Sequence, residues 1–238
     1  MQGRGKEKEG QKSSRSAQHR GGKRNQRTAT REKILAAAKR VFAEHPYSSA
    51  SIRMVGKTAG IDHPLISYYF PTKADLFEAV IEDVAETYYQ ANTSWFEGLG
   101  KLSASRSLSL YIDRLLDFTA TNPEALRIIA LNLVQPEESI IIPGYRRIQA
   151  LLVSNTETFR KIAVLRSSTR EIRMFTESFN TLVINYLGAP AYYAGILGMN
   201  PRSRAYLKWV KETLLFIFLP RLRQLLRGES QGAPAQGR

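Results

Sequence analysis

Apolar residues recur at intervals of three and four along most of the chain, which is the spacing of amphipathic α-helices. No segment alternates apolar and polar residues between turn signals, as a half-buried strand would. Glycines, prolines and an Asn-Pro pair predict helix breaks at 98–100, 122–123, 136, 143–144, 188–190 and 198–201. We therefore predict an all-α fold of about nine helices, and the lack of a visible repeat of about 30 to 45 residues disfavours a helical solenoid.

The segment 51–73 predicts two short helices joined by a sharp turn. Ser51 precedes an apolar stripe and is expected to cap the first helix, because its hydroxyl can accept a hydrogen bond from a free amide of the first turn. Gly60 can adopt a positive φ, which lets the chain turn, and Asp62 is then placed to cap a second helix with Pro64 in its first turn. Two helices joined in this way are the layout that places one helix in the DNA major groove.

The second helix of this pair is expected to begin near His63 and to end at the proline that follows it. Ser67 and Tyr68 fall at positions that can point away from the core, which leaves a hydrogen-bonding face. Thr72 can cap a third helix with Lys73 in its first turn, where a helix N-terminus already favours anions. Lys73 is therefore predicted to contact a phosphate.

This pattern resembles the amino-terminal domain of the TetR family of transcriptional regulators. The resemblance runs from Thr28 to about Val84 and is carried by Ile34-Leu35, Ala37-Ala38, Phe42, Tyr47, Ser51-Ile52, Ala59-Gly60-Ile61, Ile66, Tyr69-Phe70 and Lys73. It implies a homodimer that binds double-stranded DNA at a near-palindromic operator. It also implies a second helical domain that binds a small-molecule effector, and a repressor that leaves the operator when the effector binds.

Four residues depart from the family pattern. Pro46 stands where a glycine commonly ends the first helix, which we expect to end two residues earlier. Met54 stands where an acidic residue often completes a capping box with Ser51, so that reciprocal hydrogen bond should be absent. Gly56 replaces a usual alanine, at a cost of roughly 0.5–1 kcal/mol in a helix interior. Ser67 replaces a frequent tyrosine, which removes one aromatic phosphate contact.

The predicted DNA contacts lie on both helices of the pair, on the third helix and in the amino-terminal segment. Base edges or thymine methyls are assigned to His63, Pro64, Leu65 and Ser67; phosphates to Tyr68, Tyr69 and Lys73; further contacts to Ser51 and Arg53; and phosphate or minor-groove contacts to Lys23, Arg24 and Arg27.

The formal net charge of +14 is concentrated at the amino-terminal end, where residues 1–30 carry nine Lys or Arg against two Glu. Because this stretch has almost no apolar residues, we predict a flexible basic tail over 1–27, and a second flexible tail over 228–238. The helix-turn-helix domain is expected over 28–74 and the ligand-binding and dimerisation domain over 75–227. The basic tail either contacts DNA or only improves solubility. If it dominated binding, the chain would be a structural nucleic-acid-binding protein, which is the alternative function.

Two late segments, 170–187 and 207–225, carry apolar residues at helical spacing. They correspond in order to the last two helices of the family that the chain resembles, which form its dimer interface. The interface residues predicted on this basis are Phe175, Phe179, Leu182, Tyr186, Leu207, Val210, Leu214 and Phe218. Such stripes also occur in the core of a single chain, which is the alternative.

Aromatic residues scattered through the second domain are candidates for an effector pocket that takes an apolar or aromatic small molecule. The candidate effector contacts are Tyr88, Trp95, Phe96, Tyr111, Phe118, Phe159 and Phe179, together with the polar Asn132 in an otherwise apolar helix. Ordinary core packing explains each aromatic residue as well, and a hydrogen bond to a neighbouring helix explains the asparagine.

Several classes of function are disfavoured by what the chain lacks. It has no cysteine, no run of about 18 apolar residues and no apolar signal core at its start, so we expect a cytoplasmic protein without thiol chemistry. Its three histidines are far apart, and no serine-hydrolase, phosphate-loop or dinucleotide-binding motif is present. We predict no enzymatic activity, no metal and no cofactor.

Overall fold

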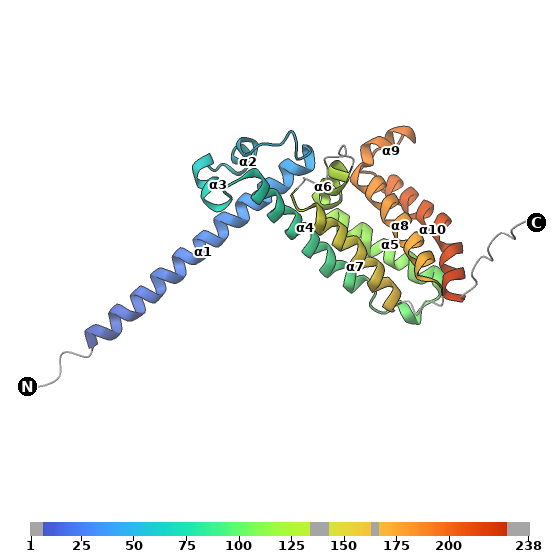
Figure 1. Ribbon diagram of the computed structural model, residues 1–238, viewed down its shortest axis with the longest axis horizontal. Helices are drawn as coiled ribbons and strands as arrows, with labels where there is room; N and C mark the ends of the chain where they lie inside the picture. Colours follow the sequence, from blue (N-terminus) through green and yellow to red (C-terminus); the bar gives the residue numbers. More distant parts are fainter. Residues whose placement is uncertain (1–6, 134–142, 163–166, 228–238) are drawn as a thin grey trace, which may run out of the picture.

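The computed structural model describes residues 7–133, 143–162 and 167–227. In these residues the chain is all-α, as predicted, with ten α-helices instead of about nine and one short 3-10 helix (Figure 1). The helices are α1 (Glu7–Glu44), α2 (Ile52–Ala59), α3 (His63–Tyr69), α4 (Lys73–Trp95), η1 (Leu99–Lys101), α5 (Ala104–Thr121), α6 (Pro123–Leu133), α7 (Tyr145–Ile162), α8 (Thr169–Gly188), α9 (Pro190–Ile196) and α10 (Arg204–Arg227).

Helix α1 is much longer than the sequence predicted, and its amino-terminal half projects away from the rest of the molecule (Figure 1). Residues 7–27 were expected to be a flexible tail, but they continue the helix. The segment 7–27 contains no proline and is rich in Lys, Arg and Gln, so despite Gly10, Gly21 and Gly22 it extends a helix that the packed second half has already nucleated. Residues 1–6 and the predicted tail 228–238 lie outside the described residues.

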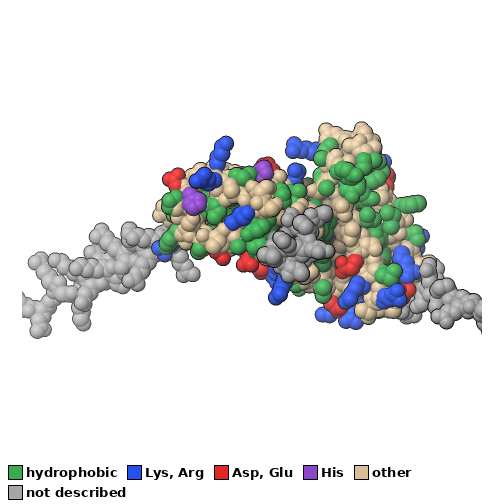
Figure 2. Space-filling model, turned by 45° about the horizontal axis from the view of Figure 1, so that its top comes forward, with side chains coloured by type: hydrophobic (Ala, Val, Ile, Leu, Met, Phe, Trp, Pro, Cys, Tyr) green, Lys and Arg blue, Asp and Glu red, His purple; other side chains and the backbone are tan. Residues whose placement is uncertain are grey.

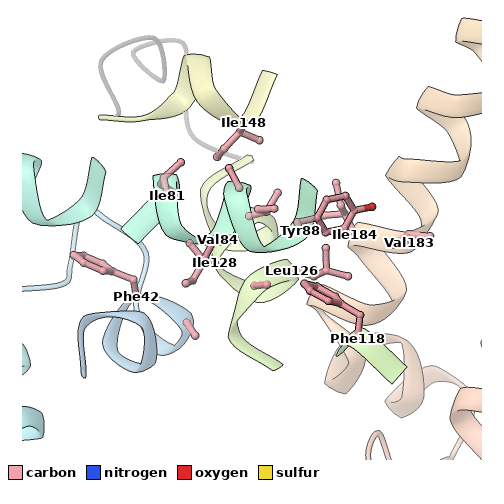
Figure 3. Packing of buried hydrophobic residues seen from close by; sticks show 14 of the residues in the cluster. Phe42, Ile81, Val84, Tyr88, Phe118, Leu126, Ile128, Ile148, Val183 and Ile184 are labelled. Atoms are coloured by element: carbon pink, nitrogen blue, oxygen red, sulfur yellow. The ribbon is translucent and has the colours of Figure 1, made fainter. Parts of the chain in front are cut away.

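Helix α4 is the element that joins the two ends of the molecule. Thr72 caps it as predicted, and Asp75 completes a capping box, with its carboxylate 2.9 Å from the Thr72 amide nitrogen. The buried face of α4 then meets residues from α1, α6, α7 and α5 in turn (Figure 3). The buried residues of this face include Leu76, Phe77, Val80, Ile81, Val84, Ala85 and Tyr88. One hydrophobic core therefore runs from the amino-terminal helices into the second domain.

Helices α5 to α10 make up the rest of the molecule, with α8 packed closely against α6. Gly188 makes this approach possible, because a Cβ atom there would lie 2.6 Å from the carbonyl oxygen of Leu126 and 2.7 Å from the Cβ atom of Ala130. Helix α10 lies beside α5, where Lys211 forms an ion pair with Asp113 at 2.6 Å.

Most of the apolar stripes that were predicted to form a dimer interface are core of the single chain. Five of the eight predicted residues are buried inside the chain: Phe175, Phe179, Val210, Leu214 and Phe218. Leu182, Tyr186 and Leu207 are half-buried. The helical period identified apolar faces on α8 and α10, but these faces pack against α5, α7 and each other, which the period alone could not show.

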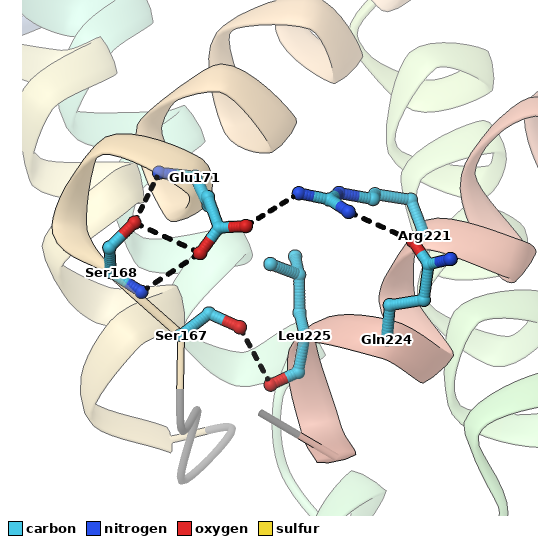
Figure 4. Close-up of polar contacts among 6 residues, drawn as sticks. All are labelled: Ser167, Ser168, Glu171, Arg221, Gln224 and Leu225. Atoms are coloured by element: carbon cyan, nitrogen blue, oxygen red, sulfur yellow. Dashed lines mark hydrogen bonds and ion pairs between the residues drawn. The ribbon is translucent and has the colours of Figure 1, made fainter. Parts of the chain in front are cut away.

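The first turn of α8 is tied to the last turns of α10 (Figure 4). Ser168 caps α8, and the Glu171 carboxylate accepts from both the Ser168 amide and hydroxyl, at 3.2 and 2.9 Å. Arg221 donates to the other carboxylate oxygen at 2.8 Å. The hydrogen bonds from Ser168, and then Arg221, lower the pKa of the Glu171 carboxyl below its ordinary value.

We expect Glu171→Gln to lower the melting temperature at neutral pH. The folded pKa of Glu171 is depressed, so its contribution to stability is present above the unfolded pKa of about 4.3 and is lost as pH falls through the lower folded pKa. Thermal unfolding from pH 7 to pH 3 should therefore show a difference between variant and parent that shrinks below about pH 4. Glu212→Gln is the matched control, because its ion pair with Lys208 is exposed and 3.8 Å long. A difference that stays constant with pH would contradict this account.

Gly56 owes its place in α2 to a close approach of the backbone. A Cβ atom at this position would lie 2.8 Å from the carbonyl oxygen of Ile61, in the turn after α2. The sequence alone indicated only a loss of helix propensity, but an alanine here would push against the backbone of the turn.

We expect Gly56→Ala to lower the free energy of unfolding by roughly 1–3 kcal/mol, because overpacking outweighs the gain in helix propensity. Gly195→Ala in α9 is the matched control, since no heavy atom lies within 4 Å of an added Cβ there. The control should be neutral or gain up to about 1 kcal/mol. Urea unfolding followed by circular dichroism measures both, and a stabilising Gly56→Ala would refute the steric explanation.

Candidate DNA-binding face and buried cavity

The turn between α2 and α3 has the local geometry that the sequence predicted. Ser51 caps α2 by accepting from the Met54 amide at 3.3 Å, and the reciprocal capping bond is absent because Met54 cannot provide it. Gly60 ends the helix in the left-handed region, with φ at 61°. Helix α3 begins at His63 as predicted, but the side chain of Asp62 makes no capping hydrogen bond.

Helix α3 separates a buried side from an exposed side. Ile66 and Phe70 are buried, with exposed fractions of 0% and 3%. On the other side, Leu65 is 45% and Tyr68 62% exposed, which is unusual for large apolar side chains and leaves them free for a partner. The predicted base contacts His63 and Pro64 are also exposed, whereas Ser67 and Tyr69 are half-buried. Basic and histidine side chains stand on the surface around α2 and α3 (Figure 2).

Arg27 of α1 lies against the exposed side of α3. Its Nη2 atom donates to the Tyr68 hydroxyl at 3.0 Å, and its guanidinium carbon lies 5.9 Å from the centre of the Tyr68 ring. The predicted tail contact Arg27 is therefore placed beside the predicted contacts of α3. The backbone of Lys23 and Arg24 belongs to α1, and their side chains lie outside the described part of the structure.

Lys73 was predicted to contact a DNA phosphate, and its side chain makes hydrogen bonds within the protein. Its Nζ atom donates to the carbonyl oxygens of Tyr47 and Ala50 at 2.8 and 3.2 Å, and it lies 4.3 Å from the centre of the Tyr47 ring. The lysine thereby ties the start of α4 to the turn between α1 and α2. Its position in the first turn of a helix favoured an anion contact, but the nearby carbonyl groups could not be recognised from the sequence.

Asn132 ties the second domain to the same turn. It is 1% exposed, its Oδ1 accepts from the Tyr47 amide at 3.0 Å, and its Nδ2 donates to Ile128 at 2.8 Å. Arg127 adds a second link, donating from Nε to the carbonyl oxygen of Ala43 at 2.6 Å. Asn132 was predicted as an effector contact. It is instead a buried link between α6 and the amino-terminal helices, which was the alternative.

The amino-terminal helical domain carries an excess of positive charge. Residues 28–74 contain seven Lys or Arg and three acidic residues, for a net charge of +4. Of these basic residues, Arg53 and Lys57 on α2 are exposed. The sign of the charge and the exposure of α3 both suit a polyanionic partner.

A cavity of about 260 Å³ lies between the end of α4 and helices α5, α7, α8 and α10. Its lining residues are Phe96, Leu99, Gly100, Leu102, Ala104, Ser107, Leu108, Tyr111, Asn155, Phe159, Phe175, Thr176, Phe179, Asn180, Leu222 and Leu226.

Half of the predicted effector contacts line this cavity and half do not. Phe96, Tyr111, Phe159 and Phe179 line it. Tyr88, Trp95 and Phe118 pack edge to face on one another in the core. Phe175, predicted at the dimer interface, also lines the cavity. The cavity is also lined by Asn155, Thr176 and Leu222, which were not predicted. These residues lie on three different helices, and only the packing of those helices brings them to the same cavity.

Metal chemistry finds no support in the described residues. Within 7–133, 143–162 and 167–227, no group of three His, Cys, Asp or Glu side chains is placed to hold a metal ion. Among the helices described, none is both long enough and apolar enough to cross a bilayer.

An exposed helix that follows a capped helix and a glycine turn, on a domain of positive charge, defines a helix-turn-helix DNA-binding protein. Residues 34–80 match the family described as bacterial regulatory proteins, tetR family. The chain is 21% identical to a probable HTH-type transcriptional regulator of Bacillus subtilis, YttP, over 79% of this chain and 91% of that protein. It is 32% identical to the HTH-type transcriptional repressor SCO4008 of Streptomyces coelicolor, over 42% of this chain and 48% of that protein.

The fold agrees with these matches. A crystal structure of a transcriptional regulator from Rhodococcus superposes with a TM-score of 0.59 at 20% identity, covering 80% of this chain and 96% of that one. Residues 34–80 thus carry the DNA-binding domain of the tetR family, and the chain is a transcriptional regulator of this type with a helix-turn-helix DNA-binding domain.

We expect Lys73→Met to lower the free energy of unfolding by roughly 1–3 kcal/mol, because it leaves carbonyl oxygens of the turn without their charged donor. Lys57→Met is the control, since Lys57 is exposed on α2. It should change stability by no more than about 0.5 kcal/mol. Urea unfolding measures both. Equal stability of the two variants would mean that the Lys73 contacts contribute little and that its main role lies elsewhere.

Proposed function

We propose that the protein is a homodimeric repressor that binds a near-palindromic operator and releases it when a small apolar or aromatic molecule occupies the cavity. The observation that carries this proposal is the course of α4. At its start, Lys73 holds the turn that precedes α2, and just beyond its end Phe96 lines the cavity. A change in the cavity therefore acts on the same rigid helix that positions the DNA-binding face.

The DNA contacts that we propose are on the exposed side of the helix-turn-helix. His63, Pro64 and Leu65 at the start of α3 are exposed and suit base edges or thymine methyls. Tyr68 suits a phosphate, with Arg27 beside it. Arg53 on α2 is exposed and suits a second phosphate. Ser51 and Lys73 are occupied by contacts within the protein, so we assign them a positioning role.

Dimerisation is proposed through the exposed sides of α8 and α10. On these helices Met174 is 61%, Phe216 82% and Ile217 43% exposed, while the residues on the opposite sides fill the core. Exposed apolar side chains grouped on neighbouring helices are typical of a surface that another protein covers. A second copy of the chain would supply the second recognition helix that a near-palindrome requires.

In this mechanism the effector acts by binding one spacing of the two recognition helices better than the other. Only such a difference in affinity can shift the equilibrium between the two states. The change between the two states is transmitted through the buried face of α4 and through the hydrogen bonds of Lys73 and Asn132 to the turn at Tyr47. The similar protein SCO4008 is named a transcriptional repressor, which supports repression rather than activation. The protein acts in the cytoplasm and has no enzymatic activity.

The test is selection of bound sequences from random duplex DNA by the purified full-length protein at near-physiological salt. One near-palindrome should be enriched. Removing residues 1–27 should leave that sequence preference in place with weaker affinity, whereas a structural nucleic-acid-binding protein driven by its basic end would lose nearly all binding. Recovery of DNA without a common motif would overturn the proposal.

With the selected operator, we expect Arg53→Ala to lower the salt dependence of log K by roughly 0.9 and to weaken all sequences alike, because one phosphate contact is lost. Arg106→Ala on α5 is the control, since this arginine is exposed in the second domain. It should leave the salt slope unchanged. Titrations at four salt concentrations measure both slopes. A slope that Arg53→Ala leaves at the parent value would remove Arg53 from the contacts.

A further inference from the structure

Five aromatic rings form a closed circuit around the cavity. In order around the circuit they are Phe96, Tyr111, Phe179, Phe175 and Phe159, and all five line the cavity. Successive ring centroids are 5.1, 5.9, 6.5, 5.4 and 6.3 Å apart, the last distance closing the circuit from Phe159 back to Phe96. The rings come from the end of α4 and from α5, α7 and α8. Their faces and edges give a wall that suits an aromatic molecule.

Two side-chain amides on this wall have unused donors. Asn155 is 7% exposed, and its Oδ1 accepts from Asn92, whose own Oδ1 accepts from the Tyr111 hydroxyl at 2.7 Å. This chain occupies the oxygen of Asn155 and leaves its buried Nδ2 without a hydrogen bond. The buried Nδ2 of Asn180 also has no partner. Unpaired buried donors are uncommon and costly, and an acceptor atom of a ligand would satisfy them.

The Tyr88 hydroxyl lies beside the Asn155 amide. Burial raises the pKa of Tyr88 and the Asn155 side chain opposes that rise, but the contact does not meet hydrogen-bond geometry and leaves Asn155 Nδ2 without a partner. The hydroxyl groups of the lining already have partners: Ser107 donates to the Leu99 carbonyl oxygen, Tyr111 donates to Asn92, and Thr176 lies 2.8 Å from the hydroxyl of Thr156. The lining side chains whose donors lack a partner are therefore the amides of Asn155 and Asn180.

The charges around the cavity indicate an uncharged ligand. None of the lining residues is Asp, Glu, Lys, Arg or His. Burial, followed by the effect of Tyr88, raises the pKa of Tyr111 well above its ordinary value, so Tyr111 is neutral. Aromatic faces attract cations, but amide N–H groups repel them and no carboxylate lines the cavity to balance one. An anion would likewise meet no cationic side chain.

We infer that the aromatic circuit of Phe96, Tyr111, Phe159, Phe175 and Phe179 binds an uncharged aromatic molecule whose carbonyl-type oxygen accepts from Asn155 and Asn180. The size fits, because a cavity of about 150 Å³ already holds benzene and this one measures about 260 Å³. The regulatory meaning of this site rests on the proposed function, but the binding itself does not.

The test uses two probes that differ in one group. Benzophenone has two rings joined by a carbonyl group, and diphenylmethane has the same rings joined by a methylene. Calorimetric titration of the full-length protein, in matched cosolvent, should show benzophenone binding roughly 3- to 10-fold more tightly, the ratio expected for a hydrogen bond to a neutral acceptor. Benzyltrimethylammonium, an aromatic cation, should bind more weakly than either.

Variants assign the difference to the amides. Asn180→Leu and Asn155→Leu should each reduce the preference for benzophenone over diphenylmethane while retaining diphenylmethane binding. Two positions are used because Asn155→Leu also breaks the bond to Asn92 and lowers stability, whereas Asn180 makes no such bond through Nδ2. Gln149→Leu is the control, since Gln149 is exposed on α7 outside the cavity and should leave the preference intact.

Equal affinity for the two neutral probes, tighter binding of the cation, or no binding of benzophenone would overturn the inference. A separate titration of operator DNA, with and without benzophenone, distinguishes this failure from failure of the proposed function. If benzophenone binds with the expected preference and the affinity for DNA does not change, the ligand site stands and the proposed regulation through it is wrong.

Discussion

The turn between α1 and α2 is held from two sides, and the position of the DNA-binding face depends on this hold. Asn132 of α6 accepts from the Tyr47 amide, and Lys73 of α4 donates to the Tyr47 and Ala50 carbonyls. The Tyr47 amide and the Tyr47 and Ala50 carbonyls are thus hydrogen-bonded to side chains from other helices. Backbone groups that are shielded from water require such partners. The Tyr47 ring packs on Phe77 of α4 with centroids 4.9 Å apart. Polar and apolar contacts therefore fix the same short segment.

This arrangement makes the two domains mechanically continuous. Helix α4 contacts this turn through its first residue and ends beside the cavity. Its buried face contributes to one core along its length (Figure 3). Helix α6, which carries Asn132, also packs against α8, whose Phe175 and Phe179 line the cavity. Two helices thus lead from the cavity to the turn. A rigid helix transmits a displacement at one end to the other, because a close-packed core has little freedom to absorb it.

The second domain combines a tight core with one space that its side chains do not fill. Around that space neighbouring aromatic rings lie at interplanar angles from 10° to 64°, with centroids 5.1 to 5.9 Å apart. Leu222 of α10 lines the cavity next to Arg221, which is tied to Glu171 on α8 (Figure 4). The ion pair that joins α8 to α10 therefore lies beside a residue of the cavity wall.

The sequence by itself determined the ends of α2 and α3 and the start of α4. Ser51, Gly60, Thr72 and the stop after Phe70 act on atoms within a few residues, so local chemistry was enough to predict them. Tertiary structure decided which side of a helix is buried and what a polar side chain bonds to. Lys73 bonds to carbonyls more than twenty residues away, and Asn132 to an amide more than eighty residues away. Phe175 and Phe179 had the spacing of an interface and line a cavity, because a helical period identifies an apolar face but not the neighbour that covers it.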